Sequence, residues 1–211
     1  MKLLFITLFY LVYPGADHFK LQNGDLIFLE SCNSTIGNAI KNVTSSAENY
    51  HFTHVGMVYI KENDSIFVIE ATHPRVKITP LSEYLYPADE KKKCYPKSVV
   101  GRLKSEYQHC IPKALEEALP LVGKEYDYSY DLKNNKYYCS ELIYLILLKA
   151  NDGIPVFPLN KMTFKSEITK EFLPEWVNYF KKQGIAIPEG EPGINPGAMS
   201  KASVIEIVHY Y

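Results

Sequence analysis

The segment from Tyr137 to Leu148 is apolar on nearly every side, and no other feature limits the fold of this chain so strongly. Its length, and the turn residues Asn151, Asp152 and Gly153 that follow it, predict a helix. A helix without a polar face has to be surrounded by protein. We therefore expect this helix to lie at the centre of the fold, with the other elements packed around it.

Much of the remaining apolar sequence falls into short runs rich in β-branched and aromatic residues, which are typical of strands. Two runs, 54–60 and 66–71, flank the turn residues Glu62, Asn63 and Asp64 and predict an antiparallel hairpin. The other predicted elements are strands at 26–29, 76–79, 99–103 and 204–208, and helices within 31–46, at 80–86, from 112 to 122 and around Trp176. The last strand is expected to rejoin the sheet. The pattern predicts one α+β domain, with a mostly antiparallel sheet packed on helices.

The N-terminus has the parts of a secretory signal: Lys2, a short apolar run at 3–13, and then Pro14, Gly15 and Ala16. We expect a signal peptide at 1–16 and a single domain at 17–211, exported to the periplasm or secreted. The alternative is a buried first element in a soluble cytoplasmic protein. The run is too short to span a bilayer and no other segment is long enough, so no membrane span is expected.

Charge and cysteine content narrow the possible partners. A formal net charge of −1 argues against nucleic acid, which requires a basic excess or stripe. The four cysteines, Cys32, Cys94, Cys110 and Cys139, lack the paired spacing of a structural zinc site, so no metal is expected. Export would permit a disulfide, for which Cys94 and Cys110 are the plausible pair, although spacing does not fix connectivity. The oligomeric state is not indicated.

Cys139 lies where the central helix is expected to begin, after a polar loop rich in tyrosine. The positive end of a helix macrodipole favours a thiolate. The first backbone N–H groups of a helix also lack intrahelical acceptors and can bind a developing oxyanion. These features predict a nucleophile. The competing interpretation is a small buried apolar side chain, which free cysteines usually are.

A nucleophilic cysteine needs a base, and His54 is the best-placed histidine because it opens a strand and so has a rigid mount. His51 and His73 fall in loops and look solvated, whereas His209, in the final strand, stays an alternative.

The base in turn needs a group that accepts its second ring N–H. Glu70 follows four apolar residues, where a carboxylate is costly unless it is paired. Pairing around a turn near Asn63 brings Glu70 close to His54, so the open end of the hairpin is expected to carry both. The rival carboxylate, Glu141, lies in the first turn of the central helix and is more simply explained as its cap.

Four segments carry a family resemblance: Asn23-Gly24-Asp25-Leu26-Ile27-Phe28, Thr53-His54-Val55-Gly56-Met57-Val58, Val68-Ile69-Glu70-Ala71 and Tyr138-Cys139-Ser140-Glu141-Leu142-Ile143-Tyr144. In this order they resemble the YiiX/YebB-like group, which are circularly permuted, papain-like relatives of the NlpC cell-wall peptidases. The resemblance runs from about Leu21 to about Leu148. The order His, acid, Cys is the permuted one, since ordinary papain-like enzymes place the cysteine helix first.

The resemblance implies a circularly permuted papain-like fold with the nucleophile at a helix N-terminus. It implies that Cys139 is the nucleophile, that His54 is its base and that Glu70 orients His54. It also implies that the segment with Ser31 and Cys32 lies along the substrate cleft. The tyrosines before the nucleophile, including Tyr138, would form a wall of this cleft, although packing explains them equally well.

The implied reaction is acyl transfer through a thioester, without a cofactor, on an amide substrate such as a cell-wall peptide. The same scaffold is similar to lecithin–retinol acyltransferase, so a lipid-directed acyl hydrolase or acyltransferase is one alternative. A lipid site would be a broad apolar groove, whereas a peptide site would have charged anchors. A second alternative is a binding module that keeps the fold without catalysis.

Overall fold

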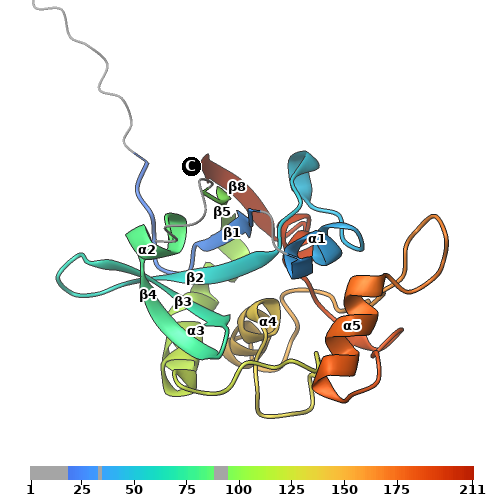
Figure 1. Ribbon diagram of the computed structural model, residues 1–211. Helices are drawn as coiled ribbons and strands as arrows, with labels where there is room; N and C mark the ends of the chain where they lie inside the picture. The colour runs from blue at the N-terminus through green and yellow to red at the C-terminus, as the bar shows by residue number, and fades with distance from the viewer. Residues whose placement is uncertain (1–18, 33–34, 88–94) are drawn as a thin grey trace, which may run out of the picture.

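The chain folds around one six-stranded antiparallel sheet, as a computed structural model that describes residues 19–32, 35–87 and 95–211 shows (Figure 1). The strands of this sheet are β1 (Leu26–Glu30), β2 (His54–Ile60), β3 (Ile66–Thr72), β4 (Arg75–Pro80), β5 (Lys97–Leu103) and β8 (Ile205–Tyr210). They lie in the order β4-β3-β2-β1-β5-β8. The expected signal peptide at 1–16 and Cys94 lie outside the described residues.

Helices and a small two-stranded sheet complete the domain. The helices are α1 (Thr35–Lys41), α2 (Leu81–Leu85), α3 (Ile111–Ala118), α4 (Cys139–Ala150), α5 (Pro174–Gln183) and α6 (Pro196–Ser200), and 3₁₀ turns lie at Ala47–Asn49, Ser105–Cys110 and Leu119–Leu121. The small sheet pairs β6 (Asn160–Lys161) with β7 (Pro192–Gly193). No helix in the part of the chain that the structure describes is long and apolar enough to cross a membrane.

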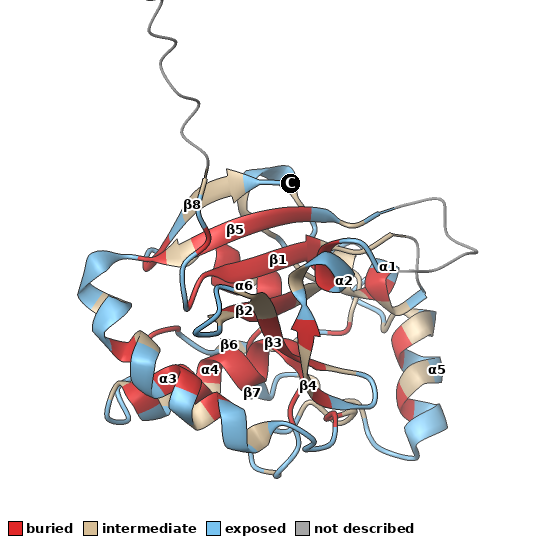
Figure 2. Cartoon of the chain, turned by 90° about the vertical axis from the view of Figure 1, so that its left-hand side faces the viewer, coloured by how far each residue is buried: buried red, intermediate tan, exposed pale blue. Residues whose placement is uncertain are grey.

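The apolar helix α4 lies at the centre, as its sequence predicts. Leu142, Ile143, Ile146 and Leu147 are completely buried, and α4 packs against α3 and against strands β2 and β3. Figure 2 shows α4 and the middle strands of the sheet as the most continuously buried parts of the chain. The prediction of an α+β domain with an antiparallel sheet on helices is confirmed.

The predicted hairpin forms with the expected register. Met57 pairs with Ile69, so one step further along Glu70 falls opposite Gly56 and diagonal to His54. The last strand, β8, joins the sheet beside β5, also as predicted.

Two parts of the chain differ from the sequence prediction. The helix expected from 112 to 122 is shorter, because the 3₁₀ turn Leu119–Leu121, with a proline in it, ends the α-helical part at Ala118. The tail contains α6, β6 and β7 in addition to the predicted helix around Trp176. These elements are too short to leave a periodic pattern in the sequence.

The cysteine pairing differs as well. Cys110 carries a free thiol and is buried, so its expected disulfide with Cys94 is wrong. Cys32 is disulfide-bonded. A disulfide requires two Cβ atoms within about 4.5 Å, and this condition depends on the tertiary fold and not on sequence spacing.

The large sheet has two apolar faces. Val55, Met57, Ile69 and Ala71 point toward α4, while the alternate residues pack under Tyr84 of α2. A third apolar cluster joins α1 to α5 through Ala39, Phe164, Trp176 and Phe180.

Candidate active site

Cys139 is the first residue of α4, so its side chain lies at the N-terminal end of the most buried helix. Tyr138 precedes it with an extended backbone, and the N–H of Leu142 donates to the carbonyl oxygen of Tyr138 to close the first turn. The thiol is free and the residue is 7% exposed, within reach of a cleft. The backbone N–H groups of this first turn lack intrahelical acceptors, which suits them to bind an oxyanion.

His54 and Glu70 form a short hydrogen bond on the sheet beside this helix end. The Nε2–H of His54 donates to Oε2 of Glu70 at 2.6 Å, and the acceptor is a carboxylate, which fixes the ring nitrogen as the donor. Both side chains lie on the face of the sheet opposite the one that packs on α4. His54 can reach Cys139 because it is the first residue of β2 and therefore lies at the end of that strand, where the sheet stops.

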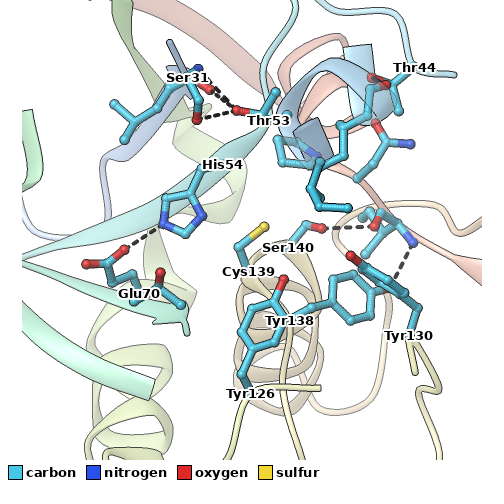
Figure 3. A pocket seen from close by; sticks show the side chains of 18 of the residues that line it. Ser31, Thr44, Thr53, His54, Glu70, Tyr126, Tyr130, Tyr138, Cys139 and Ser140 are labelled. Carbon is cyan, nitrogen blue, oxygen red and sulfur yellow. Dashed lines mark hydrogen bonds and ion pairs between the residues drawn. The ribbon is translucent and has the colours of Figure 1, made fainter. Parts of the chain in front are cut away.

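The remaining ring nitrogen of His54, Nδ1, faces the sulfur of Cys139 (Figure 3). Burial lowers the pKa of His54, but hydrogen bonds and charge from Cys139 and Glu70 outweigh it and raise this pKa from 6.5 to about 10. The imidazole is therefore held as a cation near neutral pH, between two groups that stabilise the charge.

Glu70 is 5% exposed and has several partners besides His54. Thr79 Oγ1 donates to Oε1 at 2.5 Å, and the ammonium of Lys77 lies 3.5 Å from the same oxygen. Burial raises the pKa of Glu70, but His54, Thr79 and Lys77 outweigh it and leave this pKa below the ordinary 4.5. The carboxylate is therefore ionised and fixed in orientation, as an orienting group requires.

The three side chains open into a cleft of about 460 Å³, which is within the range of small-ligand sites. Ser31 and Tyr138, two of the three predicted substrate contacts, line it. The two hydroxyl groups of Ser31 and Thr53 lie 2.6 Å apart and hold this edge of the cleft. Cys32, the third predicted substrate contact, is not among the lining residues, and it is disulfide-bonded.

The competing residues of the sequence analysis lie elsewhere or act differently. Glu141 is completely buried and accepts a hydrogen bond from the N–H of Tyr138 at 3.0 Å, which is the helix cap that the sequence predicts. His209 stacks on Phe19 with ring centroids 4.2 Å apart. His73 is exposed but lines the cleft, with its ring tilted against that of Tyr126 at a centroid distance of 4.2 Å.

Several residues of the site were missed by sequence reasoning. Thr79 ends a predicted strand, and its diagonal position relative to Glu70 follows only from the β3–β4 register. Tyr84, whose hydroxyl donates to the carbonyl of Ile27 at 2.8 Å, places its ring 5.8 Å from that of His54. Ile194 brings the tail to the cleft, because its carbonyl accepts from Ser140 and its N–H donates to Tyr138. The sequence carried no signal for Ile194, which lies 55 residues after Cys139.

A sheet hairpin that presents a histidine and a carboxylate to a cysteine at a helix N-terminus defines a papain-like class of protein, and the order along the chain is the permuted one. A sequence model of the permuted papain-like amidases, the YaeF/YiiX or C92 family, matches residues 20–209. The chain therefore belongs to this family of permuted papain-like amidases, and the resemblance stated from the motifs is confirmed.

Two relatives illustrate the match. The uncharacterized protein YiiX of Escherichia coli strain K12 is 33% identical over 150 residues, which are 71% of this chain and 69% of that protein. The crystal structure of YiiX from Escherichia coli O157:H7 is similar with a TM-score of 0.71 and 27% identity, covering 92% of this chain and 99% of that one.

The O157:H7 protein is described as a metalloprotein. Within residues 19–32, 35–87 and 95–211 of this chain, no group of three His, Cys, Asp or Glu side chains is arranged to hold a metal ion. Glu70 and Cys139 instead each interact with His54, which lies between them. The described residues therefore do not fit a metal site.

Proposed function

We propose that this chain is a cysteine amidase in which Cys139 attacks the carbonyl carbon of an amide. Before the attack His54 already holds the proton taken from the thiol, as an imidazolium beside the sulfur, and Glu70 holds this ring in the required orientation. The observation that carries the proposal is the contact chain Cys139–His54–Glu70, contributed by α4, β2 and β3 at the mouth of one cleft.

The reaction proceeds in two steps. In the first, the bond between Sγ and the carbonyl carbon forms, the carbon–nitrogen bond breaks, and the proton held by His54 goes to the leaving nitrogen. In the second, water attacks the carbonyl carbon of the thioester and gives a proton to His54, the carbon–sulfur bond breaks, and His54 shares this proton again with Sγ. The acid leaves, and Cys139 returns to its starting state. The N–H groups at the start of α4 stabilise the oxyanion of both tetrahedral intermediates.

For the substrate, a peptide amide such as a cell-wall fragment remains our proposal, together with export of the protein. A peptide site needs charged anchors, and Lys77 and Glu83 line the part of the cleft beside Glu70. Export would bring the enzyme to such a substrate. N-terminal sequencing of the protein recovered outside the cytoplasm tests export, because an unprocessed Met1 terminus would contradict it.

Hydrolysis of acyl p-nitroanilides tests the chemistry. We expect Cys139→Ala to abolish turnover and His54→Gln to lower kcat by about 10²–10⁴-fold, the usual contribution of a general base. Intact mass spectrometry should detect an acyl-enzyme on the wild-type protein and none on Cys139→Ala.

Alkylation by iodoacetamide at neutral pH tests the activated thiol without a substrate. Cys139 should react faster than free N-acetylcysteine, and His54→Gln should remove the difference. If Cys139 reacts no faster and His54→Gln leaves its rate unchanged, the site is idle and the fold serves as a binding module.

A further inference from the structure

Lys77 is a charged side chain of the cleft that takes no part in the proposed bond cleavage. It pairs with Glu70 across strands β3 and β4, so the two side chains lie on the same face of the sheet, and both line the cleft. The Lys77 side chain is 41% exposed, and its Nζ lies 3.5 Å from Oε1 of Glu70 and 3.7 Å from Oε1 of Glu83. Both distances exceed the roughly 2.7–3.2 Å of a well-formed hydrogen bond. The ammonium group is therefore able to donate to a ligand.

Neither carboxylate near Lys77 accounts for its place in the cleft. Glu70 is already held by hydrogen bonds from His54 and Thr79, so its orientation does not depend on Lys77. Glu83 lies on the short helix α2 with its side chain 57% exposed, and an ion pair this open to water is weak. Glu83 thus marks a direction from which a carboxylate reaches the ammonium group of Lys77, and the carboxylate of a ligand can replace it there.

The proposed reaction places the leaving group on the side of the cleft where Lys77 lies. His54 has to reach the leaving nitrogen in order to protonate it. Figure 3 shows His54 and Glu70 together on one side of Cys139, with Ser140 on the other. The leaving nitrogen therefore lies beside His54, and the rest of the leaving group extends toward Glu70 and Lys77, while the acyl group stays bonded to the sulfur.

We infer that the substrates of this site release an amine that carries a carboxylate, such as an amino acid, and that Lys77 binds this carboxylate. The inference rests on the proposed function, and it specifies the leaving half of the substrate. An ammonium group distinguishes a carboxylate from the corresponding amide or ester, because only the carboxylate accepts a hydrogen bond as an anion. Lys77 is then a specificity residue of the cleft and not only a neighbour of Glu70.

Two chromogenic amides that differ by one carboxylate test the inference on the full chain. Acetyl 3-carboxy-4-nitroanilide releases 5-amino-2-nitrobenzoate, whereas acetyl 4-nitroanilide releases the uncharged 4-nitroaniline. We expect kcat/KM to be about tenfold higher for the carboxylated amide, between the contributions of an exposed ion pair and of a buried hydrogen bond to a charged group. Equal values, or a lower value for the carboxylated amide, would overturn the inference while the Cys139 chemistry stands.

Variants separate recognition of the substrate from support of Glu70, because the ratio of the two kcat/KM values cancels a general loss of activity. Lys77→Met should bring this ratio to about one, and Lys77→Arg should keep most of it. Glu83→Gln should raise the ratio, since the carboxylate of the substrate no longer competes with that of Glu83. Lys161→Met is the matched control, because Lys161 of β6 also lines the cleft, and it should leave the ratio unchanged. An unchanged ratio in Lys77→Met, or an equal fall in both lysine variants, would contradict binding by Lys77.

Protection of Cys139 from alkylation is a second measurement, and it needs no turnover. The amine 5-amino-2-nitrobenzoate should slow the reaction of Cys139 with iodoacetamide at concentrations at which 4-nitroaniline does not, and Lys77→Met should abolish the difference. Thermal unfolding of each variant verifies that it is folded. Equal protection by the two amines would also overturn the inference.

The proposed function fails in a different way. If neither amide is cleaved and Cys139 reacts with iodoacetamide no faster than free N-acetylcysteine does, the cysteine chemistry itself is refuted. If Cys139 is activated but neither amide is cleaved, the protection measurement decides whether Lys77 binds a carboxylate.

Discussion

At the scale of single residues, the site depends on a buried carboxylate that keeps its charge. Glu70 is surrounded by a cation, a hydroxyl donor and an ammonium group, and together they lower its pKa despite burial. The same carboxylate helps to raise the pKa of His54. The charge state of the pair is therefore coupled to folding.

This coupling predicts a pH dependence of stability. Because the pKa of His54 rises from 6.5 to about 10 on folding, its contribution is fully present below pH 6.5 and is lost as the pH rises toward 10. The pKa of Glu70 is lowered from 4.5 on folding, so the contribution of Glu70 to stability is fully present above pH 4.5 and is lost as the pH falls below this value. The free energies of unfolding in urea of wild type and His54→Gln should therefore differ most between pH 4.5 and pH 6.5. A difference that grows from pH 6.5 to 10 would contradict the assignment.

Thr79 is predicted to matter through Glu70 alone. Thr79→Val removes the hydroxyl that donates to Oε1, a hydrogen bond to a charged group, and should lower the free energy of unfolding by about 1.5–3 kcal/mol. Because Glu70 then loses a fixed orientation, kcat should fall by about tenfold. Thr72→Val makes the same chemical change in the same cleft and should leave kcat near that of wild type.

At the scale of elements, the close approach of β2 and β3 sets the geometry of the pair. A Cβ atom added at Gly56 would lie 2.4 Å from Cγ1 of Val68 and 3.1 Å from the carbonyl oxygen of Ile69. Gly56 therefore allows the two strands, and Tyr84 above them, to pack at the distance at which His54 and Glu70 meet.

Gly56→Ala should consequently destabilise the fold by about 1–3 kcal/mol through overpacking. It should also lower kcat, because the strands that carry His54 and Glu70 are displaced. Val68→Ala removes the atom nearest to the added methyl group, so Gly56→Ala should be less harmful in that background. A double-mutant cycle on unfolding free energies measures this coupling, and strictly additive effects would argue against the steric explanation.

At the scale of the whole molecule, an ion pair joins the turn before β1 to β5. Arg102 donates to both oxygens of Asp25, from Nε at 2.7 Å and from Nη2 at 2.8 Å, and Asp25 is 1% exposed. Gly24, which lies between Asn23 and Asp25, has a φ of +84°. A Cβ atom at this position would lie 2.6 Å from the side chain of Ile111. The Asn-Gly-Asp motif thus fixes the central strand of the sheet to its neighbour.

Arg102→Leu should therefore destabilise the protein by about 2–3 kcal/mol, since it leaves the charge of Asp25 buried and unpaired. Lys113→Leu, which breaks an exposed ion pair with Asp152, is the matched control and should have a much smaller effect. Urea unfolding of the two variants provides the comparison, and equal losses would show that burial of Asp25 is not the reason.

The sequence by itself determined the local elements and the chemical character of the site. The length of one apolar run and the turn after it predicted α4, and two runs of β-branched and aromatic residues around a turn predicted the β2–β3 hairpin, because these signals depend only on residues that are neighbours along the chain. The hairpin register then followed from its turn, which is why His54 and Glu70 were predicted to meet. The start of α4 at Cys139 followed from the change from a polar to an apolar segment.

Only the tertiary structure decided how distant segments meet. The place of β1 between β2 and β5, the free thiol of Cys110, and the contact of Ile194 with Ser140 depend on packing between residues far apart in sequence. The part that α1 has in the cleft was equally hidden, because Ile36 and Ile40, which line it, have the spacing of ordinary core residues. A local pattern shows that a side chain is apolar, whereas the three-dimensional arrangement decides whether it is enclosed in the core or lines a cleft.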